Sequence, residues 1–184
     1  MITKNILLKN FQKKCPSSLK KKLKIFLKKE DSAIINSLKL DYRYSYTRQM
    51  VKKYKNNFSI LRIIGMGGSI LGTKAIFSFL KRRIKKKTIF YDNLVPIVKP
   101  GKEKKTLNLI VSKSGNTLET ISNTNILIKK NQKNIFITEN SKNYLRLLAN
   151  KMKAEVIDHN NFIGGRYSVL SEVGMLPASL VGLN

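Results

Sequence analysis

Several features are scarce in this sequence of 184 residues, and each shortage excludes a class of protein. The single cysteine, Cys15, cannot form a disulfide within the chain, so a reducing, cytoplasmic compartment is the simplest interpretation. No apolar run reaches the ~18 residues of a membrane helix. The opening stretch, MITKNILLKNFQKK, lacks the apolar core and the small-residue cleavage site of a signal peptide. We therefore expect a cytoplasmic protein with no membrane partner.

Acidic residues are also scarce, because ten Asp and Glu stand against 37 Lys and Arg, for a formal net charge of +27. Such a charge attracts polyanions and raises the question of a nucleic-acid partner. Only seven of the basic residues are arginines, the type that nucleic-acid readers favour for bidentate contacts. The lysines are spread along the whole chain, together with many Asn and Ile, as in drift towards an AT-rich coding sequence. We expect weak polyanion binding but no specific nucleic-acid partner.

The hydrophobic content of 42% is sufficient for one domain with a core, and the pattern changes near residue 58. Residues 1–58 predict a helical N-terminal extension, because apolar positions from Leu19 to Leu27 recur at the spacing of one helix face. The lysines between them are interpreted as the solvated face. Tyr42, Tyr44 and Tyr46 alternate as in a short strand, but a helix or loop is favoured there.

From residue 59 onwards, short β-rich runs alternate with helical patterns. Strands are expected over residues 60–64, 88–91, 107–111, 134–138 and 154–157. Helices are expected to follow the first, third and fourth of these strands. This alternation predicts an α/β fold over residues 59–184, with a doubly wound parallel sheet flanked by helices. Ligands of such sheets bind beyond the carboxyl ends of the strands.

Three motifs fall at that end of the expected sheet, and the first is GMGGSILG, residues 65–72. Its glycines allow a tight turn and a close approach of the backbone to a ligand, and Ser69 follows near a helix N-terminus. The spacing matches neither the dinucleotide fingerprint nor the phosphate loop of nucleotide-binding proteins. An ordinary strand–helix turn is the alternative.

The second motif, SKSGNTLET at residues 112–120, places several hydroxyl groups between a strand and a helix. A helix N-terminus offers unpaired N–H groups and the positive end of a dipole, and hydroxyl groups add donors without charge. This combination suits a phosphate ester, on which Ser112, Ser114 and Thr117 are placed to converge. Ordinary N-capping is the alternative, but it needs only one such residue.

The third motif is IGGRYSVLSEVGMLPASL, residues 163–180, where two glycines precede Arg166. An arginine behind paired glycines can reach inward and stabilise developing negative charge. A surface arginine in a loop is the alternative.

Together, IGMGGSILG, VSKSGNTLET and GGRYSVLSEVGMLPA resemble the signature segments of the glucose-6-phosphate isomerase family, which has the sugar isomerase (SIS) fold. The resemblance covers about residues 60–184, whereas residues 1–58 resemble only the general helical N-terminus of the family. It implies a SIS domain at residues 59–184, isomerisation of glucose 6-phosphate and fructose 6-phosphate, and no metal or organic cofactor. It also implies a homodimer for full-length members.

The resemblance further implies a role for each matching residue. Gly68 and Ser69 would lie beside the sugar, and Arg166 would stabilise the enediolate intermediate. The phosphate pocket would consist of Ser112, Lys113, Ser114 and Thr117, with Thr120 at its edge.

The chain departs from the family after the third motif. The family's general base, its ring-opening histidine and its second SIS domain all lie beyond that motif, and the sequence stops at Asn184. Glu172 has the neighbours of a helix start, and His159 is expected to be an exposed bystander in a polar loop. The final LPASLVGLN is an apolar helical pattern with nothing to cover it, which indicates a missing partner segment. We therefore expect a truncated isomerase that is inert alone.

A non-catalytic SIS module that binds a sugar phosphate and regulates another process is the alternative. Arg166 favours descent from an isomerase, because a sensor does not need to stabilise an enediolate.

Overall fold

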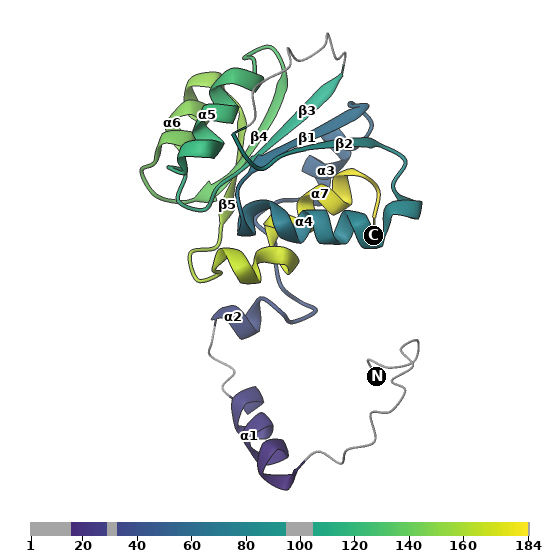
Figure 1. Ribbon diagram of the computed structural model, residues 1–184, viewed down its shortest axis with the longest axis vertical. Helices are drawn as coiled ribbons and strands as arrows, with labels where there is room; N and C mark the ends of the chain where they lie inside the picture. Colours follow the sequence, from purple (N-terminus) through teal and green to yellow (C-terminus); the bar gives the residue numbers. More distant parts are fainter. Residues whose placement is uncertain (1–15, 29–32, 95–104, 184) are drawn as a thin grey trace.

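A computed structural model describes residues 16–28, 33–94 and 105–183 of the chain (Figure 1). Its centre is a parallel sheet with the strand order β2-β1-β3-β4-β5 and helices on both faces. The strands are β1 (Ile60–Gly65), β2 (Lys87–Tyr91), β3 (Thr106–Val111), β4 (Lys133–Glu139) and β5 (Glu155–His159). The α/β class and all five predicted strands are therefore confirmed.

Helices from different parts of the chain cover the two faces of the sheet (Figure 1). One face carries α3 (Arg48–Lys55), α4 (Gly68–Phe79) and α7 (Glu172–Leu180), and the other carries α5 (Leu118–Leu127) and α6 (Tyr144–Met152). Successive strand residues alternate between the two cores, as Ile63 and Ile64 do in β1. Strand β3 is buried along its whole length, because it is central and covered on both faces.

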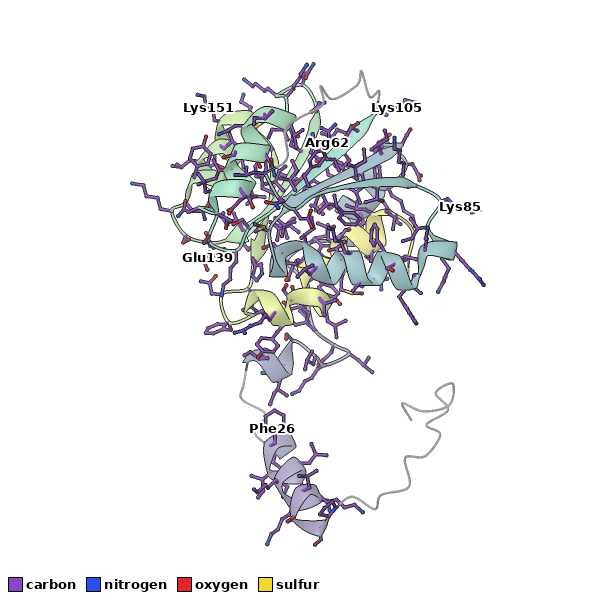
Figure 2. All side chains as sticks on the ribbon, viewed as in Figure 1. Phe26, Arg62, Lys85, Lys105, Glu139 and Lys151 are labelled. Carbon is purple, nitrogen blue, oxygen red and sulfur yellow. The ribbon has the colours of Figure 1, made fainter. Side chains whose placement is uncertain are left out.

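A buried arginine ties three strands to the end of a helix in the α5 and α6 layer. Arg62, only 2% exposed and labelled in Figure 2, donates to Asn108 Oδ1 and to the Leu127 carbonyl, both at 3.1 Å. Asn108 in turn donates to Asn134 Oδ1 at 2.7 Å. A cation is favourable at the negative end of the α5 dipole, and the amides satisfy polar groups that burial would otherwise penalise.

The N-terminal part consists of α1 (Ser17–Lys28), α2 (Ala33–Asn36) and α3 in the described residues. Leu19, Leu23 and Phe26 of α1 are each more than half exposed, so the described residues do not cover the expected apolar face. Figure 1 shows α1 well away from the sheet. Residues 42–46 form a loop, which agrees with the helix-or-loop interpretation and not with a strand.

The expectation that the apolar C-terminal pattern lacks a cover is wrong. Val173, Leu176 and Leu180 of α7 are fully buried in the core that α7 shares with α3 and α4. The prediction failed because the pattern of one helix does not reveal that α3, more than 100 residues earlier, packs against it.

The first residue of α7 anchors the loop that leads into α3. Glu172 is completely buried, and its carboxylate accepts hydrogen bonds from the Tyr42 hydroxyl at 3.1 Å and from the Ser45 backbone N–H at 3.0 Å. Ser171 caps the helix, and a carboxylate in the first turn also suits the helix dipole. Burial, together with the neighbouring Glu172 charge, raises the pKa of Tyr42 to about 12, so its hydroxyl stays a donor. Glu172 therefore starts a helix, as expected, and holds the 42–46 loop.

Replacing this carboxylate should lower the free energy of unfolding of the chain. We expect Glu172→Ala to cost about 3 kcal/mol, because it leaves the Tyr42 and Ser45 donors without an acceptor. Urea unfolding, followed by circular dichroism, measures the loss. Tyr42→Phe removes one donor and should cost only about 1 kcal/mol; equal midpoints for the wild-type chain and Glu172→Ala would contradict the anchoring role.

Candidate functional site

The three sequence motifs meet in a cleft at the carboxyl end of the sheet. The residues that line it come from the β1–α4 turn, the β3–α5 loop, the end of β4 and the start of the short 3₁₀ helix η2 (Gly165–Leu170). They are Met66, Gly68, Ser69, Lys113, Ser114, Thr117, Glu139 and Gly165. This is the edge where ligands of parallel sheets bind.

The first and third motifs touch through two glycines. A Cβ atom on Gly68 would collide with the backbone of Gly165 and lie 2.8 Å from its Cα. The Ser168 hydroxyl lies 2.7 Å from the Gly165 carbonyl and 3.2 Å from the Gly68 carbonyl, so it bridges the same segments. The turn itself needs Gly67, whose φ is +54°, in a region that disfavours side chains. The close packing sets the width of the cleft on this side.

The second motif has a rigid internal structure. Ser112 is 1% exposed, its Oγ lies 3.0 Å from Thr117 Oγ1, and it accepts the Gly115 N–H at 3.2 Å. Gly115 has φ +66°, and a Cβ atom there would collide with the Asn143 side chain. The Lys113 ammonium donates to the Asn161 carbonyl at 2.7 Å and so ties the motif to the loop before Arg166.

Helix α5 begins at this motif without a side-chain cap. Its N-cap residue is Thr117, whose side chain makes no capping hydrogen bond. By contrast, Thr47, Asn143 and Ser171 accept a backbone N–H at the start of α3, α6 and α7. Ordinary capping therefore does not explain the hydroxyl groups of the motif, and the first turn of α5 offers N–H groups to an anion.

The structure separates the predicted site residues into three groups. Five of them line the cleft, namely Gly68, Ser69, Lys113, Ser114 and Thr117. Ser112 and Thr120 lie behind the surface, each 1% exposed, and Thr120 Oγ1 has no hydrogen-bond partner among the described residues. Arg166 is exposed and is not among the lining residues, although Gly165 beside it is.

Sequence reasoning missed Glu139, the last residue of β4, which also lines the cleft. Its backbone N–H donates to the Lys113 carbonyl at 3.0 Å, which places it directly beside the second motif. The signal was available, because the residue comes directly after the predicted strand 134–138 at the carboxyl end of the sheet.

The expectation that His159 is an exposed bystander is wrong. The side chain is 2% exposed and ends β5, directly opposite Glu139 in the register of the two strands. Its Nδ1 lies 2.9 Å from the Asn160 carbonyl, and burial lowers its pKa. The prediction failed because β5 continues two residues past the expected end at 157 and carries the histidine into the sheet.

Comparison with known proteins decides the family. The phosphoglucose isomerase model matches residues 48–183. The chain belongs to the phosphoglucose isomerase family. It is 34% identical over 146 residues to the glucose-6-phosphate isomerase of Methanocaldococcus jannaschii, covering 72% of this chain and 36% of that protein. The enzyme of Borreliella afzelii is 33% identical over 181 residues, covering 88% and 33%. The chain thus spans about a third of the length of these isomerases.

Solved structures agree with this family. A glucose-6-phosphate isomerase from Chlamydia trachomatis matches with a TM-score of 0.64 at 26% identity, over 84% of this chain and 32% of that one. A hypothetical protein from Thermus thermophilus matches with a TM-score of 0.71 at 22% identity, over 90% and 44%, which supports the fold. Within the described residues, no helix is long and apolar enough to span a membrane, and no three or more His, Cys, Asp or Glu side chains form a metal site.

The contact between the two glycines predicts the effect of a single methyl group. We expect Gly68→Ala to cost about 1–3 kcal/mol in free energy of unfolding, because the backbone at Gly165 has to move away. Gly164→Ala is the matched control, since its Cβ atom would meet nothing closer than 3.6 Å. Urea unfolding of both variants measures the difference, and similar midpoints would show that the contact is not required.

The buried histidine predicts a pH dependence of stability. Its pKa in the folded chain is lowered, so the unfolded chain binds the proton more tightly. Stability is therefore full above the unfolded histidine pKa of ~6.5 and is lost as pH falls towards the folded value, by at most about 1.4 kcal/mol per pH unit.

The measurement is the free energy of unfolding at pH 7.5 and at pH 5.5, for wild type and for His159→Gln. Burial is the main cause of the lowered pKa, and the nearby Lys113 charge adds to it, while Glu172, Glu139 and the Asn160 carbonyl oppose it. The variant should lose less stability on acidification than wild type. Parallel losses would show that His159 does not contribute.

Proposed function

We propose that the cleft binds the phosphate of a hexose 6-phosphate and that the chain is the sugar-phosphate-binding part of a glucose-6-phosphate isomerase. The observation that carries this proposal is the uncapped N-terminus of α5 beside the hydroxyl groups of Ser114 and Thr117. Membership of the phosphoglucose isomerase family supports the choice of sugar.

We call the start of α5, together with Ser114 and Thr117, the phosphate seat. Its chemistry favours a phosphate monoester. The first-turn N–H groups of α5 and the positive end of its dipole attract a dianion, and the hydroxyl groups add neutral donors. Helix α4 begins at the same cleft with Gly67 as its N-cap and no side-chain cap, although Ser69 N–H already donates to the Met66 carbonyl at 3.1 Å. Helix α5 therefore supplies most of the seat, and Ser69 lies on the sugar side of it.

Isomerisation moves a proton between C1 and C2 of the open-chain sugar and passes through an enediolate. This requires a carboxylate base and a positive group near the oxygen that becomes negative. We assign the second role to Arg166, whose backbone adjoins the cleft at Gly165. We place the base and a second SIS domain in the part of the family that this chain does not span, with residues 1–58 as the helical extension and 59–184 as one SIS domain.

The complete enzyme in this proposal is a cytoplasmic homodimer that acts in glycolysis and gluconeogenesis. Sugar-phosphate binding without catalysis is the second candidate for the chain alone. The exposed side chain of Arg166, outside the lining of the cleft, favours it.

A titration of the 184-residue chain with glucose 6-phosphate, and with glucose as control, tests the binding site. We expect the amide signals of residues 112–117 to shift in NMR spectra only with the phosphorylated sugar. Ser114→Ala should weaken binding about threefold to tenfold, because one donor is lost, whereas Ser78→Ala, an exposed serine late in α4, should bind as wild type does. A folded sample without shifts would reject the seat.

The same sample tests whether the chain alone catalyses the isomerisation. We expect no conversion of fructose 6-phosphate to glucose 6-phosphate by the chain alone, because the proposal places the base outside these 184 residues. Turnover that copurifies with the chain and disappears in Arg166→Met would contradict this expectation and would place a base within these residues.

A further inference from the structure

One wall of the cleft carries a carboxylate that phosphate binding does not use. Glu139 lines the cleft together with Ser69, Ser114 and Gly165, and it is half-buried at the end of β4. In Figure 2 its label lies at the end of the sheet opposite Lys105, so it belongs to the carboxyl edge, where the three motifs meet. A carboxylate repels an anion, so its presence in a cleft proposed to bind phosphate requires an explanation.

The structure around Glu139 uses its backbone and leaves its carboxylate free. The backbone N–H donates to the Lys113 carbonyl, and the backbone carbonyl accepts from Asn143 Nδ2 and Arg146 Nε, both at 3.3 Å. Among the described residues, the carboxylate has only a contact of 3.5 Å from the Ser141 hydroxyl, at the limit of a hydrogen bond.

The basic side chains described nearby form no ion pair with this carboxylate, although the Arg146 guanidinium contacts the Glu139 backbone carbonyl. Arg146 forms its ion pair with Asp158, and the Lys113 ammonium donates to the Asn161 carbonyl. No ion pair involving Glu139 occurs in the described part of the chain. Glu139 therefore lines the cleft with a carboxylate that has no ion-pair partner among the described residues.

A cleft with these two ends selects ligands by their charge distribution. The start of α5 favours an anion, whereas Glu139 favours hydrogen-bond donors and repels a second anion. A phosphate monoester with a hydroxyl-bearing tail satisfies both ends. A bisphosphate also places one phosphate at the start of α5, but its second phosphate is repelled by Glu139.

We propose that Glu139 is a specificity-determining residue, which binds hydroxyl groups in the tail of a sugar monophosphate and rejects sugars phosphorylated at both ends. This inference rests on the proposed function, because it requires the phosphate to sit at α5. It adds to that function a residue on a strand that none of the three motifs contains. It also defines the ligand class as a phosphate monoester with an uncharged polyol tail.

The test compares dissociation constants of the 184-residue chain for inorganic phosphate, glucose 6-phosphate and glucose 1,6-bisphosphate, measured by NMR titration. Wild type should bind glucose 6-phosphate about tenfold more tightly than the bisphosphate. Glu139→Gln keeps the size of the side chain and removes its charge. It should reduce that preference to about twofold, and it should also narrow the advantage of glucose 6-phosphate over inorganic phosphate.

Glu155→Gln is the matched control, because it removes the same charge at the opposite end of the sheet, where β5 begins. Both ratios should stay at their wild-type values in this variant. Ratios, and not single affinities, are compared because the loss of any negative charge raises the affinity for every anion.

The outcomes separate this inference from the proposed function. If phosphate and glucose 6-phosphate bind and Glu139→Gln leaves both ratios unchanged, the role of Glu139 is overturned and the phosphate seat stands. If wild type binds the bisphosphate as tightly as the monophosphate, the inference is also overturned. If a folded wild-type chain binds neither phosphate nor glucose 6-phosphate, the seat itself fails and the inference fails with it.

Discussion

The contact between Gly68 and Gly165, too close to admit a side chain at Gly68, is the constraint on which the candidate site depends. It brings the turn after β1 against the start of η2, two segments almost 100 residues apart. Parallel strands alone would place their carboxyl ends on one edge, but they would not bring the third motif to that edge, because η2 comes after the edge strand β5. The contact therefore turns two neighbouring loops and a distant one into a single cleft.

Charge within the cleft depends on backbone structure more than on side chains. The net charge of +27 suggests an anion site made of lysines, yet Lys113 uses its ammonium to hold the Asn161 carbonyl. The positive end of the cleft is the start of α5, which no side chain of the described residues caps. Glu139 adds a negative charge to the lining of the same cleft. In the proposed function, dipoles and hydroxyl groups would bind a phosphate dianion and still allow its release, which a group of paired arginines would slow.

Buried polar groups hold the layers around this site in register. Arg62 joins β1, β3 and the end of α5 in one layer, and Glu172 joins the 42–46 loop to α7 in the other. Each is a charge that burial would penalise, and each has several hydrogen-bond partners that offset the penalty. Neither residue touches the cleft, but both position the helices whose ends form it.

Local patterns in the sequence were sufficient to predict the five strands, the parallel sheet, the three motifs and the edge at which they meet. These features depend on neighbours within a few residues, where apolar periodicity and glycine-rich turns act directly. The burial of His159 and the cover over α7 were decided only by tertiary structure. Each depends on where a strand ends in space or on which distant segment packs beside it, and periodicity along the chain carries no information about either.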